Sequence, residues 1–235
     1  MSFGWLIKKI RSLFSKNDSN AQELYAFILE TFKEMKSEVL SAKIVYSQLR
    51  LLNPALFKAV TDITDYEKFW DYLKTHFSGK LYFSKPFVSS IPFTNTLEVT
   101  ENYLKTLDGF DNKTIIDFES RIGLESSKGS SIFINRLSDD FVQIDETMML
   151  KKDIFNIDSM LLKRIKNTLD LYFKNNELLD TREFKAYFTF PEITGYKWNK
   201  YLLTGIIRTY FKNSFYIEKV PNDTNYIIRR IDNHE

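Results

Sequence analysis

The apolar positions in the middle of the chain change their spacing, first marking helices and then strands. Ile115, Phe118 and Ile122 recur at about the helical period, and Gly123 follows where a helix end favours a residue that accepts positive φ. A second apolar helix comes next, and the run that begins at Phe141 has the composition of two short strands separated by a polar turn. The pattern therefore predicts two helices joined by a tight turn and followed by a hairpin.

The same pattern occurs once before this region and once after it. In each case an apolar helix ends in a polar break, and an aromatic-rich strand follows at once. The three stretches are EKFWDYLKTHFSGKLYFS, SSIFINRLSDDFVQI and NKYLLTGIIRTYFKNSFYIEKV. They lie about 60 to 70 residues apart, which is a spacing compatible with internal repeats. We therefore expect mostly helix, with strands confined to short hairpins after residues 79, 140 and 214.

The first fifth of the chain has two further helical patterns. Residues 21–52 follow a helical period and predict a long helix, interrupted near Ser41. Residues 1–16 are amphipathic, with an apolar face that carries Phe3, Leu6, Ile10 and Leu13. This face predicts a helix that packs on its own body, binds a protein partner or mediates self-association, or lies on a membrane surface.

Composition limits the classes of function. The 235 residues are 43% apolar, which is enough for a sizeable core and for more than one domain. The formal charge is only +2, so any nucleic-acid surface must be local. Seven Gly and five Pro are few for a loop-rich enzyme or a β-sandwich, and the absence of Cys suits a reducing cytoplasm.

Signals for catalysis are weak. The only histidines are His76, within a predicted helix, and His234, in the terminal tail. No glycine-rich phosphate loop occurs, and acidic pairs such as Asp139 and Asp140 are explained by helix ends and turns. We therefore predict no enzymatic activity, no cofactor and no metal site.

Signals for nucleic-acid binding are better on the helix that starts at Trp198. Its polar residues recur every four positions on one stripe, which suits cations for phosphates and hydroxyls for base edges. Charged residues at the end of the following strand add to it. The predicted DNA contacts of this unit are Lys197, Lys200, Thr204, Arg208, Lys212, Arg229 and Arg230. The alternative is a solvated basic face.

The other two units differ in their outward residues. In the middle unit Ser127, Lys128, Ser131 and Asn135 have short or polar side chains that can approach DNA, although the acidic turn at 145–146 would repel phosphates. In the first unit the outward face mixes acids and lysines. It is typical of a protein contact or of plain solvent-exposed surface.

The stretch TIIDFESRIGLESSKGSSIFINRL, followed by DDFVQI, resembles winged helix-turn-helix proteins of bacteria. The resemblance implies an α+β fold, mainly α with short β-hairpins, in which tandem winged-helix-like units follow a helical N-terminal region. The expected domains are residues 1–54, 55–92, 93–156 and 157–235. The resemblance implies one of two functions. The first is a non-enzymatic, cytoplasmic protein that binds double-stranded DNA, in a bacterial, mobile-element or antiviral defence complex. The second is an accessory subunit of an SMC-type or other assembly, whose winged helices bind protein partners.

Overall fold

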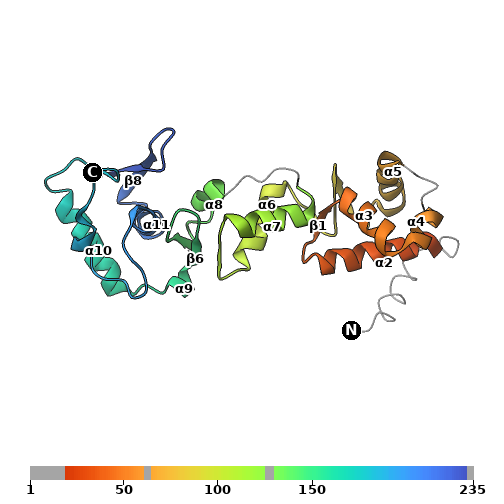
Figure 1. Ribbon diagram of the computed structural model, residues 1–235, viewed down its shortest axis with the longest axis horizontal. Helices are drawn as coiled ribbons and strands as arrows, with labels where there is room; N and C mark the ends of the chain where they lie inside the picture. The colour runs from red at the N-terminus through yellow and green to blue at the C-terminus, as the bar shows by residue number, and fades with distance from the viewer. Residues whose placement is uncertain (1–18, 61–64, 125–129, 232–235) are drawn as a thin grey trace. The chain divides into compact units, whose positions relative to one another are not determined.

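The structure is a computed structural model that describes residues 19–60, 65–124 and 130–231 (Figure 1). Helices make up about 52% of the described residues, and the strands form small three-stranded antiparallel sheets. The prediction of an α+β fold is therefore confirmed. The chain divides into two compact units, one within residues 1–100 and 117–127 and the other within 101–116 and 128–235.

A common order of elements occurs three times: helix, strand, helix, helix, strand, strand. The first repeat consists of α2 (Ser19–Glu34), β1 (Val39–Ser41), α3 (Ala42–Leu52), α4 (Pro54–Val60), α5 (Tyr66–Phe77), β2 (Tyr82–Ser84) and β3 (Phe87–Ser89). It has one additional helix, α4. Its sheet order is β1-β3-β2. Asp65 caps α5, and its carboxylate accepts from the backbone N–H of Glu67 at 3.0 Å.

The second and third repeats follow the same order. The second consists of α6 (Thr96–Lys105), β4 (Gly109–Phe110), α7 (Asn112–Ile122), α8 (Ser130–Arg136), β5 (Phe141–Gln143) and β6 (Met149–Lys151). A short helix, α9 (Lys152–Phe155), leads to the third repeat. That repeat consists of α10 (Ser159–Tyr172), β7 (Leu178–Asp180), the 3-10 helix η1 (Ala186–Thr189), α11 (Lys200–Tyr210), β8 (Phe215–Lys219) and β9 (Tyr226–Arg230). The sheet orders, β4-β6-β5 and β7-β9-β8, match that of the first repeat.

One backbone hydrogen bond recurs where each repeat passes from its last helix to its second strand. The donor N–H belongs to the first residue of the strand, or in the first repeat to the residue before it, and the acceptor is the carbonyl four residues earlier. The three bonds are Leu81 to Phe77 at 2.9 Å, Phe141 to Leu137 at 2.9 Å and Phe215 to Phe211 at 3.0 Å. These bonds give a residue-by-residue alignment of the repeats in which Leu81, Phe141 and Phe215 are equivalent.

One sequence-based prediction about the strands is wrong. Strands are not confined to the hairpins, because each sheet gains a third strand, β1, β4 or β7, from before its hairpin. The break predicted near Ser41 in the helical stretch 21–52 is confirmed, and the structure adds that β1 lies there, with all three of its residues buried. These added strands have only two or three residues, which is too short to show a period of two.

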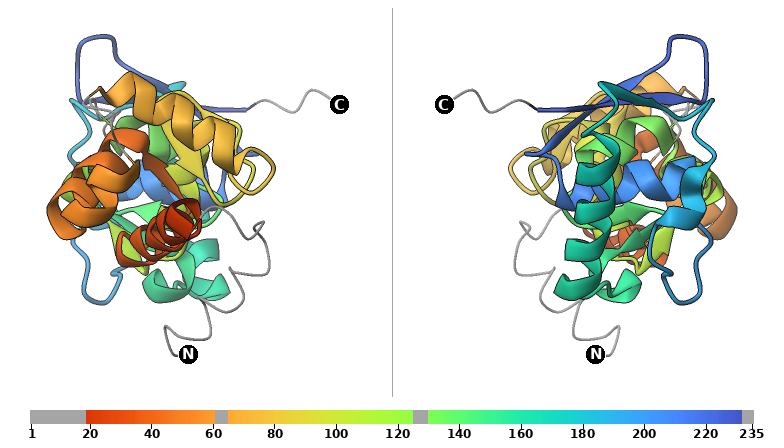
Figure 2. Two further views of the ribbon diagram at one scale, coloured as in Figure 1. Left: turned by 90° about the vertical axis from the view of Figure 1, so that its right-hand side faces the viewer. Right: turned by 90° about the vertical axis from the view of Figure 1, so that its left-hand side faces the viewer.

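The core of the second unit is continuous between the second and third repeats. Val142 of β5 belongs to the same buried cluster as Ile165 of α10, Ile206 of α11 and Ile228 of β9. Figure 2 shows α10 next to α11 in the right-hand view, in agreement with this shared core. The second strand of one repeat is therefore packed by the helices of the next.

The first unit has its own core and a tight contact at the end of α7. Leu24, Phe69 and Leu73 are fully buried. Gly123 has φ +84°, as the helix end predicted, and a Cβ added there would lie 2.5 Å from the Cβ of Ser41. Ser41 is itself buried and caps α3, so it has little freedom to move away.

The amphipathic segment 1–16, with Phe3, Leu6, Ile10 and Leu13, lies outside the described residues. Among the helices that the structure describes, none combines the length and the apolar character needed to cross a bilayer.

We predict that Gly123→Ala destabilises the protein more than Gly79→Ala. Both glycines have positive φ, +84° and +87°, so both substitutions cost about 1–2 kcal/mol of backbone strain. Only the Cβ at residue 123 meets a neighbour within 4 Å, and this overlap adds about 1–3 kcal/mol. Urea unfolding of the two variants measures the difference. Equal losses of stability would show that the Ser41 contact adjusts without cost.

Candidate functional site

The predicted DNA-reading face of α11 is mostly an internal surface. Thr204, expected near the floor of a DNA groove, is 0% exposed, so this prediction is wrong. Its hydroxyl donates to the carbonyl of Lys200 at 2.9 Å, within the same helix. The side chains from Leu202 to Ile207 are all buried, which leaves this part of α11 without an open face.

α11 lies against the outer edge of β5. In an antiparallel pair, only every second residue of a strand bonds to its partner strand. Ile144, just after β5, is such a residue, because its N–H donates to the Met148 carbonyl at 3.0 Å. The carbonyls of Phe141 and Gln143 therefore point away from β6. The Thr209 hydroxyl donates to the Phe141 carbonyl at 3.0 Å.

The contact continues to the N-terminal end of α11. Asn199 caps this helix by accepting from the N–H groups of Tyr201 and Leu202. Its amide nitrogen also donates to the Ile144 carbonyl at 3.0 Å. Side chains at the two ends of α11 thus bond the outward Phe141 carbonyl of β5 and the Ile144 carbonyl just after this strand. A helix in this position covers the edge of the sheet.

Gly205 lies at the closest point between the helix and the strand. A Cβ added there would be 2.1 Å from the carbonyl oxygen of Gln143 and 2.9 Å from its backbone nitrogen. No side chain fits in that space, and the obstacle is backbone. The glycine is therefore required by the packing of α11 on β5.

Arg208 is also taken into this contact. Its Nη1 donates to Oε1 of Gln143 at 3.2 Å, and its guanidinium lies over the Tyr226 ring, 4.8 Å from the centroid. Burial lowers the pKa of Arg208, and interactions with Tyr226 oppose that shift. The side chain joins the second repeat to the third and is not an outward phosphate ligand.

The remaining cations of the predicted stripe contact nearby protein groups. Lys200 Nζ donates to Thr224 Oγ1 at 2.8 Å and to Asn225 Oδ1 at 3.0 Å, both in the β8–β9 turn. Lys212 forms an ion pair with Asp139, and this contact lowers the pKa of Asp139. Both partners of that pair are exposed, so it contributes little to stability.

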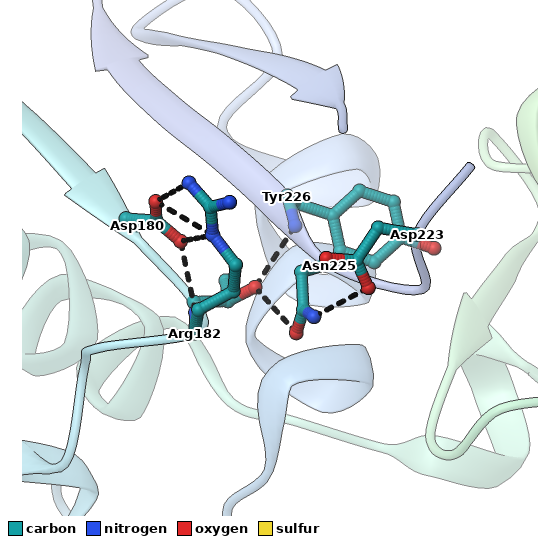
Figure 3. Close-up of polar contacts among 6 residues, drawn as sticks. Asp180, Arg182, Asp223, Asn225 and Tyr226 are labelled. Atoms are coloured by element: carbon teal, nitrogen blue, oxygen red, sulfur yellow. Dashed lines mark hydrogen bonds and ion pairs between the residues drawn. The ribbon is translucent and has the colours of Figure 1, made fainter. Parts of the chain in front are cut away.

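The β8–β9 turn is held by a second polar network (Figure 3). Thr181 Oγ1 accepts from the N–H of Tyr226 at 2.9 Å, and Asn225 Nδ2 donates to Asp223 Oδ1 at 2.6 Å. In the same view the Arg182 guanidinium binds Asp180 through both carboxylate oxygens, which lowers the pKa of Asp180. These groups fix the turn.

Lys197, Arg229 and Arg230 are exposed, as is Lys212 in its ion pair. Arg229 lies opposite Tyr216 on the outer face of the sheet, and Arg230 approaches Asp170 at 3.8 Å. The structure does not place them with Thr204 in one groove.

In the second repeat, few of the predicted DNA contacts lie among residues whose side chains are described. Ser127 and Lys128 lie outside the described residues, and the side chain of Ser131 is not described. Asn135 is exposed near the end of α8. Asp145 occupies the tip of the hairpin and accepts from the N–H groups of Thr147 and Met148, which confirms the predicted turn.

Within residues 19–60, 65–124 and 130–231, no three His, Asp or Glu side chains lie close enough together to hold a metal ion. Comparison with protein-family models, with curated proteins and with solved structures found no match to this chain. The geometry alone therefore supports the functional argument.

We predict that Gly205→Ala destabilises the protein by about 1–3 kcal/mol or more, because the added methyl overlaps backbone. At an open helix position the same change stabilises by about 1 kcal/mol, so the clash reverses the sign. Urea unfolding followed by circular dichroism measures the effect. The control is Asn167→Ala at an exposed site on α10, where we expect no loss. A Gly205→Ala variant as stable as the parent would contradict the packing of α11 on β5.

Proposed function

We propose that the chain is a tandem winged-helix-like protein that serves as a protein-binding subunit of a larger assembly, of SMC type or another kind. The threefold recurrence of helix, strand, helix, helix, strand, strand supports the winged-helix part of the proposal. So does the strand order, in which the last strand of each sheet lies between the other two. A winged helix has this order and pairing.

One observation carries the functional part. A winged-helix protein of the helix-turn-helix type reads DNA by placing its recognition helix in the major groove. In the third repeat that helix would be α11, and its predicted reading face is packed on β5 with Gly205 at the closest approach. A helix that is buried in this way binds protein.

The other two candidate recognition helices also favour protein. On α5 the exposed residues include Glu67, Lys68, Asp71 and Lys74, a mixture of charges that phosphates would not select. Residues 92–156 have 7 Lys and Arg against 12 Asp and Glu, so the segment around α8 is acidic. Such a segment repels a duplex and suits a partner with cationic or neutral groups.

A DNA contact away from α11 is the second candidate. Residues 157–231 have 13 Lys and Arg against 8 Asp and Glu. Lys163 and Arg164 are exposed on α10, and Arg229 is exposed on β9. These cations could hold phosphates without reading sequence.

Charge reversal separates the two candidates. Under the assembly proposal we expect weak duplex binding, with similar small losses for Lys163→Glu/Arg164→Glu on α10 and for the matched variant Lys68→Glu/Lys74→Glu on α5. Fluorescence anisotropy with labelled duplex, over a salt series, gives the slope of log affinity against log salt. If only the α10 variant flattens that slope, by ~0.9 per cation removed, the DNA candidate replaces the assembly proposal.

The assembly proposal also predicts a stable protein partner. A tagged full-length chain purified from its own cells should retain a stoichiometric second protein after nuclease treatment and a high-salt wash, because such a contact does not depend on nucleic acid. Mass measurement in free solution gives the composition. Recovery of the chain alone, as a monomer, would overturn the proposal.

A further inference from the structure

The outer edge of β8 is equivalent to the β5 edge that α11 covers. Phe215 starts β8 with the same backbone bond by which Phe141 starts β5, so Ile217 corresponds to Gln143. Both strands lie at the edge of their sheets. Two backbone bonds flank β8 on the side of β9. The Ser214 carbonyl accepts from the N–H of Ile231, and the N–H of Val220 donates to the Asn225 carbonyl, both at 3.0 Å. By the antiparallel alternation, the carbonyls of Phe215 and Ile217 point outward.

The two edges differ in whether anything covers them. Val142 of β5 is 0% exposed because it belongs to the core that α11 shares. Its counterpart in β8 is Tyr216, a large side chain that is 57% exposed. Within the described part of the chain, β8 pairs only with β9 and no further strand adds to its outer edge. Among the residues that the structure places, nothing covers β8 in the way that α11 covers β5.

We propose that the β8 edge, centred on Tyr216 and Ile217, binds an α-helix of a partner protein. The inference rests on the proposed assembly function and names the surface and the chemistry of the partner. In the internal contact the helix supplies Asn199 as its N-cap, Gly205 at the closest approach and Thr209 one turn later. The partner helix therefore has a small residue at the crossing point, with Ser or Thr four positions later and an amide or hydroxyl six positions earlier.

A second copy of this chain fits the edge poorly. A head-to-tail arrangement would bring the first repeat of the next copy to β8, with α5 in the place of α11. Aligning Phe77 with Phe211 puts Asp71 at the position of Gly205. A carboxylate there would face a backbone carbonyl and would also need more space than a glycine provides. The chemistry of the edge therefore selects a different protein.

The chain contains its own probe for this site. A labelled synthetic peptide of residues 198–212, which span α11, has the required residues. We expect saturable binding to the full-length protein by fluorescence anisotropy. A peptide with Gly205→Leu should bind at least about tenfold more weakly, because its side chain cannot approach the edge.

Variants of the full-length protein locate the binding. Tyr216→Glu should weaken binding of the parent peptide about tenfold or more, because it places a charge beside the docked helix. The control is Phe188→Glu on η1, which makes the same kind of change at a side chain 86% exposed outside the sheet. Far-ultraviolet circular dichroism confirms that both variants are folded. Equal binding by the two variants, or binding that ignores the Gly205→Leu change in the peptide, would overturn the proposal.

The conformation of the bound peptide tests the remaining alternative. A strand could also add to an open edge. Cα chemical shifts of a ¹³C-labelled peptide in the complex should be helical, and strand-like shifts would overturn the helix proposal. The outcome is separable from that of the assembly proposal. A partner retained by the Tyr216→Glu protein would reject the β8 site alone, whereas peptide binding by a chain that has no cellular partner would reject the assembly function alone.

Discussion

The arrangement of the second unit depends on the approach of Gly205 to the Gln143 carbonyl. An edge strand presents unpaired carbonyls, and burying them without donors is costly. α11 supplies donors from Thr209 and Asn199, yet they reach β5 only if the helix axis comes close to the strand. A Cβ at residue 205 would stand 2.1 Å from that carbonyl, so the missing side chain makes the other contacts possible.

This requirement explains why α11 cannot also face DNA. The helix is held by the core of its own repeat through Leu203 and Ile207 and by the β5 edge on another side. A helix that is apolar or covered around its circumference is a core element. The three cations on the predicted stripe, Lys200, Arg208 and Lys212, are bonded to protein oxygens. The proposal of protein binding rests on the surfaces that are left.

The sequence predicted the helices well because amphipathic periods extend over ten or more residues. It predicted the hairpins from their aromatic and β-branched residues beside polar turns, such as the one at Asp145. It missed β1, β4 and β7, because two or three residues have no visible period and gain their stability from partners distant in sequence. Their existence follows from tertiary pairing, which local patterns do not encode.

The candidate site was misjudged for a different reason. A polar residue at every fourth position was assumed to face solvent, but the Thr204 hydroxyl is satisfied by the carbonyl of its own preceding turn and can be buried. The useful signal was Gly205, since a glycine inside a strong helix costs about 1 kcal/mol and calls for a packing reason.

Charge does not set the contact between the second and third repeats, although it might be expected to. The segments 92–156 and 157–231 have opposite charge excesses, of acids in the first and of bases in the second. Their direct ion pair, Lys212 with Asp139, is exposed and therefore weak. The backbone of β5 and its following residue, in contrast, accepts bonds from α11 at the Phe141 and Ile144 carbonyls and admits only glycine at the crossing. Such a contact fixes the position of α11 along β5. Steric fit and hydrogen bonds to the strand therefore specify how the second and third repeats join, and the opposite charges only add attraction.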